Sequence, residues 1–203
     1  MLSIVIPVYN EEENINSVIE ELLENIDTQS PYEIIFVDDS SDDNTFLNIK
    51  AINLQNNNIK ILRLARRSGS HIATKAGIDA SSGDKLLVIS GDGQEDPALI
   101  KDMISNIADG FDIVWGIRDV REENLFSRLV TKIFYKGLVR FTKNTTNYSV
   151  DISNADFYML GNKVINELKK TSLKNSSLFG LLAWVGFKQT SLPYKRRKRL
   201  NGN

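Results

Sequence analysis

The sequence predicts an α/β fold built on a mostly parallel β-sheet with helices on both faces. In the first 117 residues, short segments that are apolar throughout alternate with segments of helical periodicity. This alternation is typical of parallel strands that are buried on both faces. Polar or charged residues follow five of the apolar segments. Because ligands bind beyond the carboxyl ends of parallel strands, these five ends indicate a binding site.

The elements of this fold are expected in a regular order. Strands are predicted at 2–8, 32–39, 59–65, 85–90 and 111–117. The helices between them are predicted at 11–26, 43–54, 70–81 and 97–108. The second half is predicted to add a basic amphipathic helix at 124–141, a strand at 155–160, helices at 163–170 and 178–186, and a last strand at 188–194.

Three helix starts carry local signals. Asn10 and Glu13 have the spacing of a capping box ahead of the first helix. Ser41 is expected to cap the second helix. Asp96 is expected to cap the fourth, because Pro97 follows it and proline is tolerated at the first helical position.

Composition excludes several classes of protein. The chain has 203 residues, which suits one domain, and its net charge is −1. It has no cysteine and one histidine, so disulfide frameworks, thiolate chemistry and multi-histidine zinc sites are excluded. The amino terminus lacks the features of a secretory signal, and no apolar run is long enough to span a membrane. The single basic tract KRRKR does not indicate nucleic-acid binding.

The segment ISGDGQEDP at the tip of the fourth strand predicts a cation site. Asp92 and Gln94 alternate around Gly93, so both face one side of an extended turn, and Gly91 leaves further room for a bound group. Hard divalent cations take oxygen ligands and commonly bridge substrate phosphates. The second strand also ends in acids, Asp38 and Asp39. An acid at such a strand end commonly accepts hydrogen bonds from ribose hydroxyls or base N–H groups.

The motifs VIPVYNEEENI, IIFVDDSSDDNT, LARRSGSHIATKAGIDAS and ISGDGQEDP resemble the nucleotide-sugar domain of family 2 glycosyltransferases. The later segments GIRDVREENLFSRLVTKIFYKGL and DISNADFYML resemble the branch that glycosylates polyprenyl phosphates. This resemblance implies a GT-A-type, Rossmann-like fold, a UDP- or GDP-sugar donor, inversion at the sugar and a divalent metal, Mg²⁺ or Mn²⁺. The positions that match the family's nucleoside-binding places are Pro7, Tyr9, Glu11, Val37 and Asp39.

The resemblance also implies a metal motif and catalytic groups. The family's metal motif is Asp-x-Asp with a glutamine two residues later, and Ser90, Asp92 and Gln94 stand at those three places. A neutral hydroxyl therefore replaces the first carboxylate. Arg118 and Arg199 match family arginines expected to add fixed positive charge, and Arg199 is expected to bind the donor with Gly91 and Asp92. Asp156 matches an acid that is interpreted either as a base or as an orienting group.

Seven arginines after residue 117 favour a phosphate acceptor. A phosphate monoester is already ionised at neutral pH, so it needs positioning by cations rather than a base. Arg118, Arg128 and Arg196 are the predicted acceptor-phosphate ligands. Residues 1–117 are accordingly expected to form the nucleotide-sugar half of the domain, and residues 118–203 the acceptor half.

Helix 124–141 has the basic, amphipathic character of a helix lying on a membrane surface. We therefore expect a cytoplasmic protein at the cytoplasmic face of the membrane, and a longer form of the chain would be integral to it. A homo-oligomer is compatible with the sequence. Two alternatives stay open: a soluble family 2 enzyme that glycosylates a saccharide hydroxyl, and a catalytically weakened nucleotide-sugar-binding protein, which Ser90 motivates.

Overall fold

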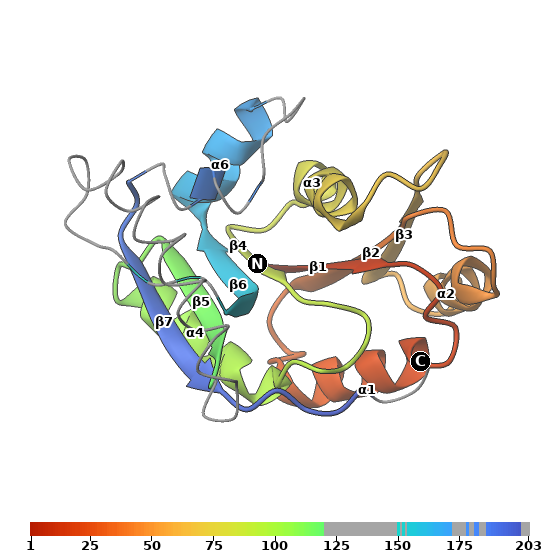
Figure 1. The fold of residues 1–203 in the computed structure, drawn as a ribbon, viewed down its shortest axis with the longest axis horizontal. Coiled ribbons are helices and arrows are strands. Elements are labelled where there is room, and N and C mark those ends of the chain that lie inside the picture. Colours follow the sequence, from red (N-terminus) through yellow and green to blue (C-terminus); the bar gives the residue numbers. More distant parts are fainter. Residues whose placement is uncertain are drawn as a thin grey trace, which may run out of the picture.

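The structure is a computed structural model that describes residues 1–119, 150, 152, 154–171, 178, 181–182 and 186–199. Its centre is a seven-stranded sheet (Figure 1). The strands are β1 (Leu2–Val8), β2 (Tyr32–Asp38), β3 (Ile59–Arg63), β4 (Lys85–Val88), β5 (Ile113–Arg118), β6 (Ala155–Gly161) and β7 (Gln189–Tyr194). The helices are α1 (Ile15–Asn25), α2 (Thr45–Asn53), α3 (Ser70–Ala80), the 3-10 turn η1 (Pro97–Leu99), α4 (Ile100–Ala108) and α6 (Asn162–Lys170). Every strand predicted from the sequence is present.

The strand order is β3-β2-β1-β4-β6-β5-β7. All neighbouring pairs are parallel except those of β6, which runs antiparallel to both β4 and β5. The pairing of Val88 with Tyr158 brings the beginning of β6 beside the carboxyl end of β4. As a result, the second half of the chain contributes residues to the same edge of the sheet at which the first five strands end.

Two apolar cores cover the two faces of the sheet. Within β1, Ile4, Ile6 and Val8 join the core formed with α1, α2 and α4, whereas Val5 faces the other core. That second core contains residues of α3 and α6, together with Leu178 and Leu182. Figure 1 shows α3 and α6 on one side of the sheet and α1 on the other. This alternation confirms the prediction that helices cover both faces.

Two predicted helix caps are wrong. Helix α1 begins after Asn14 rather than Asn10, and Asn10 has a positive φ of 53°. Helix α2 begins after Asn44, and the Ser41 hydroxyl instead accepts a hydrogen bond from the Asn10 backbone N–H. Each side chain instead forms a hydrogen bond between the segment after β1 and the segment after β2. Local sequence spacing does not reveal such a long-range contact. The predicted cap at Asp96 is confirmed, because its carboxylate accepts from the Ala98 N–H.

The predicted basic helix 124–141, which includes Arg128, lies outside the described residues. Within the residues that are described, no helix has both the length and the apolar character that crossing a bilayer requires.

A buried carboxylate joins the amino-terminal ends of the first strands. Glu33 is 4% exposed and accepts hydrogen bonds from the Ser3 hydroxyl at 2.5 Å, the Ser82 N–H at 2.6 Å and the Lys60 ammonium at 2.6 Å. Burial alone would raise the pKa of Glu33, but these three donors outweigh it and hold the pKa below its ordinary value.

Gly77→Ala tests the close approach of α3 to β1. Alanine should gain about 1 kcal/mol of intrinsic helix propensity. However, its methyl group would overlap Cγ1 of the fully buried Val5, and such overpacking typically costs about 1–3 kcal/mol. We expect a net loss in the free energy of unfolding, measured by urea denaturation. Gly161→Ala is the control, because a methyl group there meets only ordinary contacts of 3.5 Å or more; a stabilised Gly77→Ala variant would contradict the packing described.

Glu33→Gln tests the buried carboxylate. Removing the charge should lower the free energy of unfolding at neutral pH by roughly 1–3 kcal/mol. A carboxylate whose folded pKa is lowered stabilises the fold above its unfolded pKa, and that stability is lost as the pH falls through the folded pKa. The wild type should therefore lose more stability than Glu33→Gln on acidification below about pH 5. Glu167→Gln is the control, since its pair with Lys170 is solvent-exposed; parallel acid profiles for wild type and Glu33→Gln would refute the assignment.

Candidate functional site

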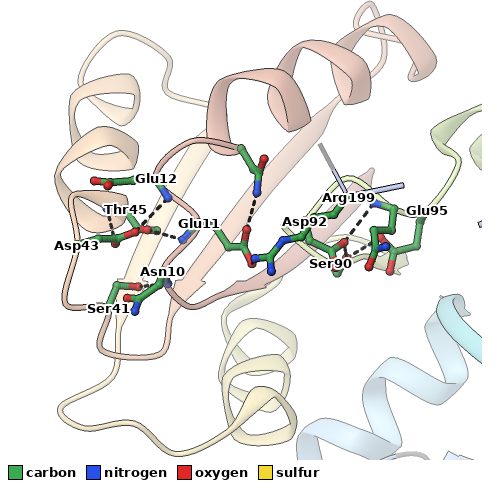
Figure 2. Close-up of polar contacts among 12 residues, drawn as sticks. Asn10, Glu11, Glu12, Ser41, Asp43, Thr45, Ser90, Asp92, Glu95 and Arg199 are labelled. Atoms are coloured by element: carbon green, nitrogen blue, oxygen red, sulfur yellow. Dashed lines mark hydrogen bonds and ion pairs between the residues drawn. The ribbon is translucent and has the colours of Figure 1, made fainter. Parts of the chain in front are cut away.

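The segments that follow β1 and β2 carry predicted donor residues, and Figure 2 shows Asn10 and Glu11 of the first segment beside residues of the second. The segment after β1 is fixed to the segment after β2 by hydrogen bonds. Asn10 donates its N–H to Ser41 Oγ at 3.0 Å and accepts from the Asp42 N–H at 2.9 Å. Glu11 donates its N–H to Thr45 Oγ1 at 2.8 Å. These bonds hold the backbone that carries Tyr9 and Glu11 toward the site.

Glu11 and Arg199 form an ion pair that spans almost the entire chain. The Glu11 carboxylate lies 2.6 Å from Nη2 of Arg199 and accepts a second bond from Asn14 Nδ2 at 2.7 Å. The hydrogen bond to Glu11 raises the pKa of Arg199, with further support from the charge of Asp92. Both residues were predicted as donor ligands, and Figure 2 shows Glu11, Arg199 and Asp92 in one group.

The guanidinium of Arg67 lies over the aromatic ring of Tyr9. The guanidinium carbon of Arg67 lies 4.0 Å from the ring centroid, and the Tyr9 hydroxyl donates to Asp42 at 3.1 Å. Asp39 holds the neighbouring loop, because its carboxylate accepts from the Ser68 N–H at 2.7 Å and the Gly69 N–H at 2.8 Å. The structure thus places Arg67, which was not among the predicted ligands, beside two predicted nucleoside residues.

The remaining residues of β1 and β2 are less accessible. Val37 is fully buried, and it is the register partner of Pro7. Asp38 is also fully buried; its Oδ2 lies 3.2 Å from Nε of Arg63, and its Oδ1 accepts from the Ser41 N–H. The Asp38 side chain therefore stabilises the end of β2. Asp39 is the acid that contacts the loop at Ser68 and Gly69.

The tip of β4 contains a serine held between two carboxyl groups. Ser90 Oγ lies 2.5 Å from Asp92 Oδ1 and 2.5 Å from Glu95 Oε2. A hydroxyl has one hydrogen, so a protonated carboxyl must donate the second bond. Glu95 is 4% exposed, and burial, with the negative charges of Asp92 and Asp156, raises its pKa to about 7. Glu95 is therefore the carboxyl that takes up this proton most readily, and it is about half protonated at pH 7.

Gln94 is held by the segment that follows β7. Its Oε1 accepts from Nη2 of Arg196 at 2.6 Å, and its Nε2 donates to the Arg197 carbonyl at 3.3 Å. Its backbone N–H donates to Asp92 Oδ1 at 3.1 Å. Gly91 faces β1, where an added Cβ would lie 2.6 Å from Val8 Cγ1, so this position requires glycine for packing.

The second half contributes an acid and cations. Asp156 of β6 accepts a hydrogen bond from the hydroxyl of Tyr194, at the end of β7. Burial, followed by this bond, raises the pKa of Tyr194, so the phenol stays protonated. Arg118 ends β5 as the register partner of Tyr194, and Arg196 follows two residues after Tyr194. The predicted acceptor residues Arg118 and Arg196 therefore share this end of the sheet, whereas Arg128 lies outside the described residues.

The donor set at the β4 tip fits a divalent cation that is held jointly with a diphosphate. No group of three or more histidine or acidic side chains suited to a metal occurs among the described residues. The oxygens on offer are those of Asp92, Ser90 and Gln94, and the Gln94 oxygen is engaged by Arg196. Magnesium commonly takes one or two carboxylates and fills its other positions with phosphate oxygens and water.

Besides Arg67, sequence reasoning missed three participants in this site. Glu95 stands one residue beyond the metal motif, and only the fold reveals its burial. Arg197 contacts Glu21 and the Glu95 carbonyl, and Tyr194 binds Asp156. The contacts of Arg197 and Tyr194 join residues far apart in the sequence, so local patterns do not reveal them. The only sequence signal for Arg197 was the basic tract in which it lies.

Comparison with known proteins supports the motif resemblance. The model of "Glycosyl transferase family 2" matches residues 3–168. An uncharacterized glycosyltransferase of Bacillus subtilis is 37% identical over 202 residues, covering 98% of this chain and 61% of the relative. The bactoprenol glucosyl transferase of Shigella phage SfV is 29% identical over 204 residues, covering 99% of this chain and 65% of that protein. The chain thus spans about three fifths of the length of these relatives.

Solved structures share the fold. A mannosyltransferase from Pyrobaculum calidifontis in complex with GDP-Man and Mn²⁺ superposes with a TM-score of 0.66 at 15% identity, covering 95% of this chain and 54% of that one. Glucosyl-3-phosphoglycerate synthase from Mycobacterium tuberculosis, with Mn²⁺ and UDP, gives 0.66 at 17% identity, covering 100% and 73%. These likenesses confirm the expected GT-A-type fold. The family model, together with the 37% identical relative, shows that the chain belongs to glycosyl transferase family 2.

Proposed function

We propose that this chain transfers a hexose from a UDP- or GDP-sugar to a polyprenyl phosphate, with inversion at the sugar and assistance from Mg²⁺ or Mn²⁺. The observation that carries the proposal is the convergence of Asp92, the Glu11–Arg199 pair and the Asp156–Tyr194 pair at one edge of the sheet. Asp92 offers negative charge to a metal ion and Arg199 offers positive charge to a diphosphate, while Arg118, the register partner of Tyr194, offers positive charge to a second anionic substrate.

On this proposal, the nucleoside lies against the tips of β1 and β2. Pro7, Tyr9 and Asp39 border it, the fully buried Val37 supports Pro7 as its register partner, and Arg67 adds a cation over the Tyr9 ring. Asp92 would hold the metal, with Ser90 and Gln94 as further oxygen ligands. The bound cation would neutralise the charge that develops on the leaving diphosphate. Arg199 adds fixed positive charge at the same place, and Glu11 orients it.

The acceptor is proposed to bind the half formed by residues 118–203. Arg118 and Arg196 lie at the shared end of β5 and β7, and Arg128 is proposed to join them. An ionised phosphate already carries the nucleophilic oxygen, so the reaction needs positioning more than a base. Asp156, bonded to Tyr194, would then orient groups of the site. Relatives whose names include bactoprenol and undecaprenyl-phosphate support this acceptor class.

A lipid acceptor requires access to a membrane, so we propose that the protein works at the cytoplasmic face. The exposed residues Lys195 and Arg196 after β7 provide positive charge for an anionic surface.

One observation favours a second candidate function. Ser90 stands where the family's metal motif has a carboxylate, and its hydroxyl hydrogen-bonds to the Asp92 carboxylate. A protein with this arrangement could bind a nucleotide sugar without turning it over. The two functions differ in whether a nucleoside diphosphate is released when acceptor is present.

Asp92→Asn tests the transferase. We expect release of UDP or GDP from the matching nucleotide sugar, dependent on undecaprenyl phosphate, to fall by about 100-fold or more, because charge stabilisation of the leaving group is lost. Asp96→Asn is the control, since asparagine also caps helices, and its turnover should stay near that of the wild type. A saccharide that replaces the lipid phosphate as acceptor would favour the soluble alternative, and wild-type donor binding without release would favour the binding protein.

Ser90→Asp tests the metal site without requiring turnover. A third carboxyl group beside Asp92 and Glu95 should destabilise the metal-free protein through like-charge repulsion. Each kcal/mol lost lowers the melting temperature by about 2–4 °C in a chain of this size. Adding Mn²⁺ should raise the melting temperature of Ser90→Asp more than that of the wild type. An equal response of both proteins to Mn²⁺ would place the cation elsewhere.

A further inference from the structure

The segment after β7 crosses to the loop at the tip of β4. Figure 1 shows this segment passing along α1. The Arg197 N–H donates to the Gln94 carbonyl at 2.9 Å, and Gln94 Nε2 donates back to the Arg197 carbonyl at 3.3 Å. This reciprocal pairing joins residues 103 positions apart in the chain, and it attaches the segment directly to the loop that carries Asp92.

The side chain of Arg197 adds a second attachment. Its Nη2 lies 2.7 Å from the Glu95 carbonyl oxygen and 2.6 Å from Glu21 Oε2, while its Nη1 lies 3.3 Å from Glu21 Oε1. The planar guanidinium suits two simultaneous partners of this kind, which a lysine ammonium reproduces poorly. Arg197 therefore connects α1, the β4 loop and the segment after β7.

The loop that Arg197 holds is the one that orients Asp92. From Glu95, the contacts continue through its carboxyl group to Ser90 Oγ and from there to Asp92 Oδ1, each at 2.5 Å. From Gln94, the backbone N–H reaches the same Asp92 oxygen at 3.1 Å. Both residues that Arg197 fixes thus touch, directly or through Ser90, the carboxylate proposed to hold the metal.

We propose that Arg197 is a positioning residue of the donor site, which holds residues 94–95 so that Asp92 faces the metal diphosphate. This inference rests on the proposed function. Arg197 acts through the loop rather than on the substrate, because its guanidinium is engaged by Glu21 and the Glu95 carbonyl. Its contribution should therefore be confined to binding that depends on the metal.

Calorimetric titration of the protein with UDP and GDP, in Mn²⁺ and in EDTA, tests this role. Arg197→Gln should weaken metal-dependent binding by roughly tenfold, the effect of losing a hydrogen bond from a charged group, and leave binding in EDTA unchanged. Lys198→Gln removes the same charge from the exposed neighbouring residue and should bind like the wild type. Arg197→Lys keeps the positive charge but not the planar guanidinium, and it should lose less metal-dependent affinity than Arg197→Gln. It also serves as the test variant if Arg197→Gln is unstable.

Hydrogen–deuterium exchange over residues 89–96 gives a readout that needs no ligand. Exchange there should be faster in Arg197→Gln than in the wild type or Lys198→Gln. Unchanged exchange, an equal loss of binding in Mn²⁺ and EDTA, or an equal effect of Lys198→Gln would overturn the role of Arg197. If the wild type bound neither nucleotide, the proposed function would fail, while the exchange experiment would still decide whether Arg197 orders the loop.

Discussion

The antiparallel pairing of β6 between β4 and β5 is the constraint on which the site depends. Five strands of a parallel sheet would bring only the first half of the chain to the binding edge. Because β6 runs the other way, its beginning lies beside the end of β4, which places Asp156 near Glu95 and Asp92. Strand β7, parallel to β5, then ends at the same edge, where Tyr194 binds Asp156.

Charge balance explains how Asp92 and Glu95 lie side by side at this edge. Glu95 is buried, and its pKa, raised to about 7, leaves it about half protonated at neutral pH, which reduces its repulsion of Asp92. Arg199 supplies positive charge from the opposite side and is itself held by Glu11. Ser90, where the family motif has an acid, links Asp92 to Glu95 through its hydroxyl. The arrangement fixes the Asp92 carboxylate at the place proposed for the metal diphosphate.

The sequence was a good guide to what local physics determines. Apolar runs identified all seven strands, and Pro97 with Asp96 marked the start of a helix, because burial and capping act over a few residues. The caps at Asn10 and Ser41 were misassigned, since these side chains bind each other's strand tips. The antiparallel direction of β6 and the contacts of Arg197 were not predictable, because both depend on residues about 70 to 180 positions apart.

The most direct test of the central claim is calorimetric titration of the wild-type protein with UDP and with GDP, each in Mn²⁺ and in EDTA. We predict that one nucleotide binds and that Mn²⁺ strengthens the binding, because a cation held by Asp92 at the tip of β4 would offset the negative charge of the diphosphate. Binding of neither nucleotide, or binding of equal affinity in EDTA, would contradict the claim that this edge of the sheet is a metal-assisted nucleotide-sugar site.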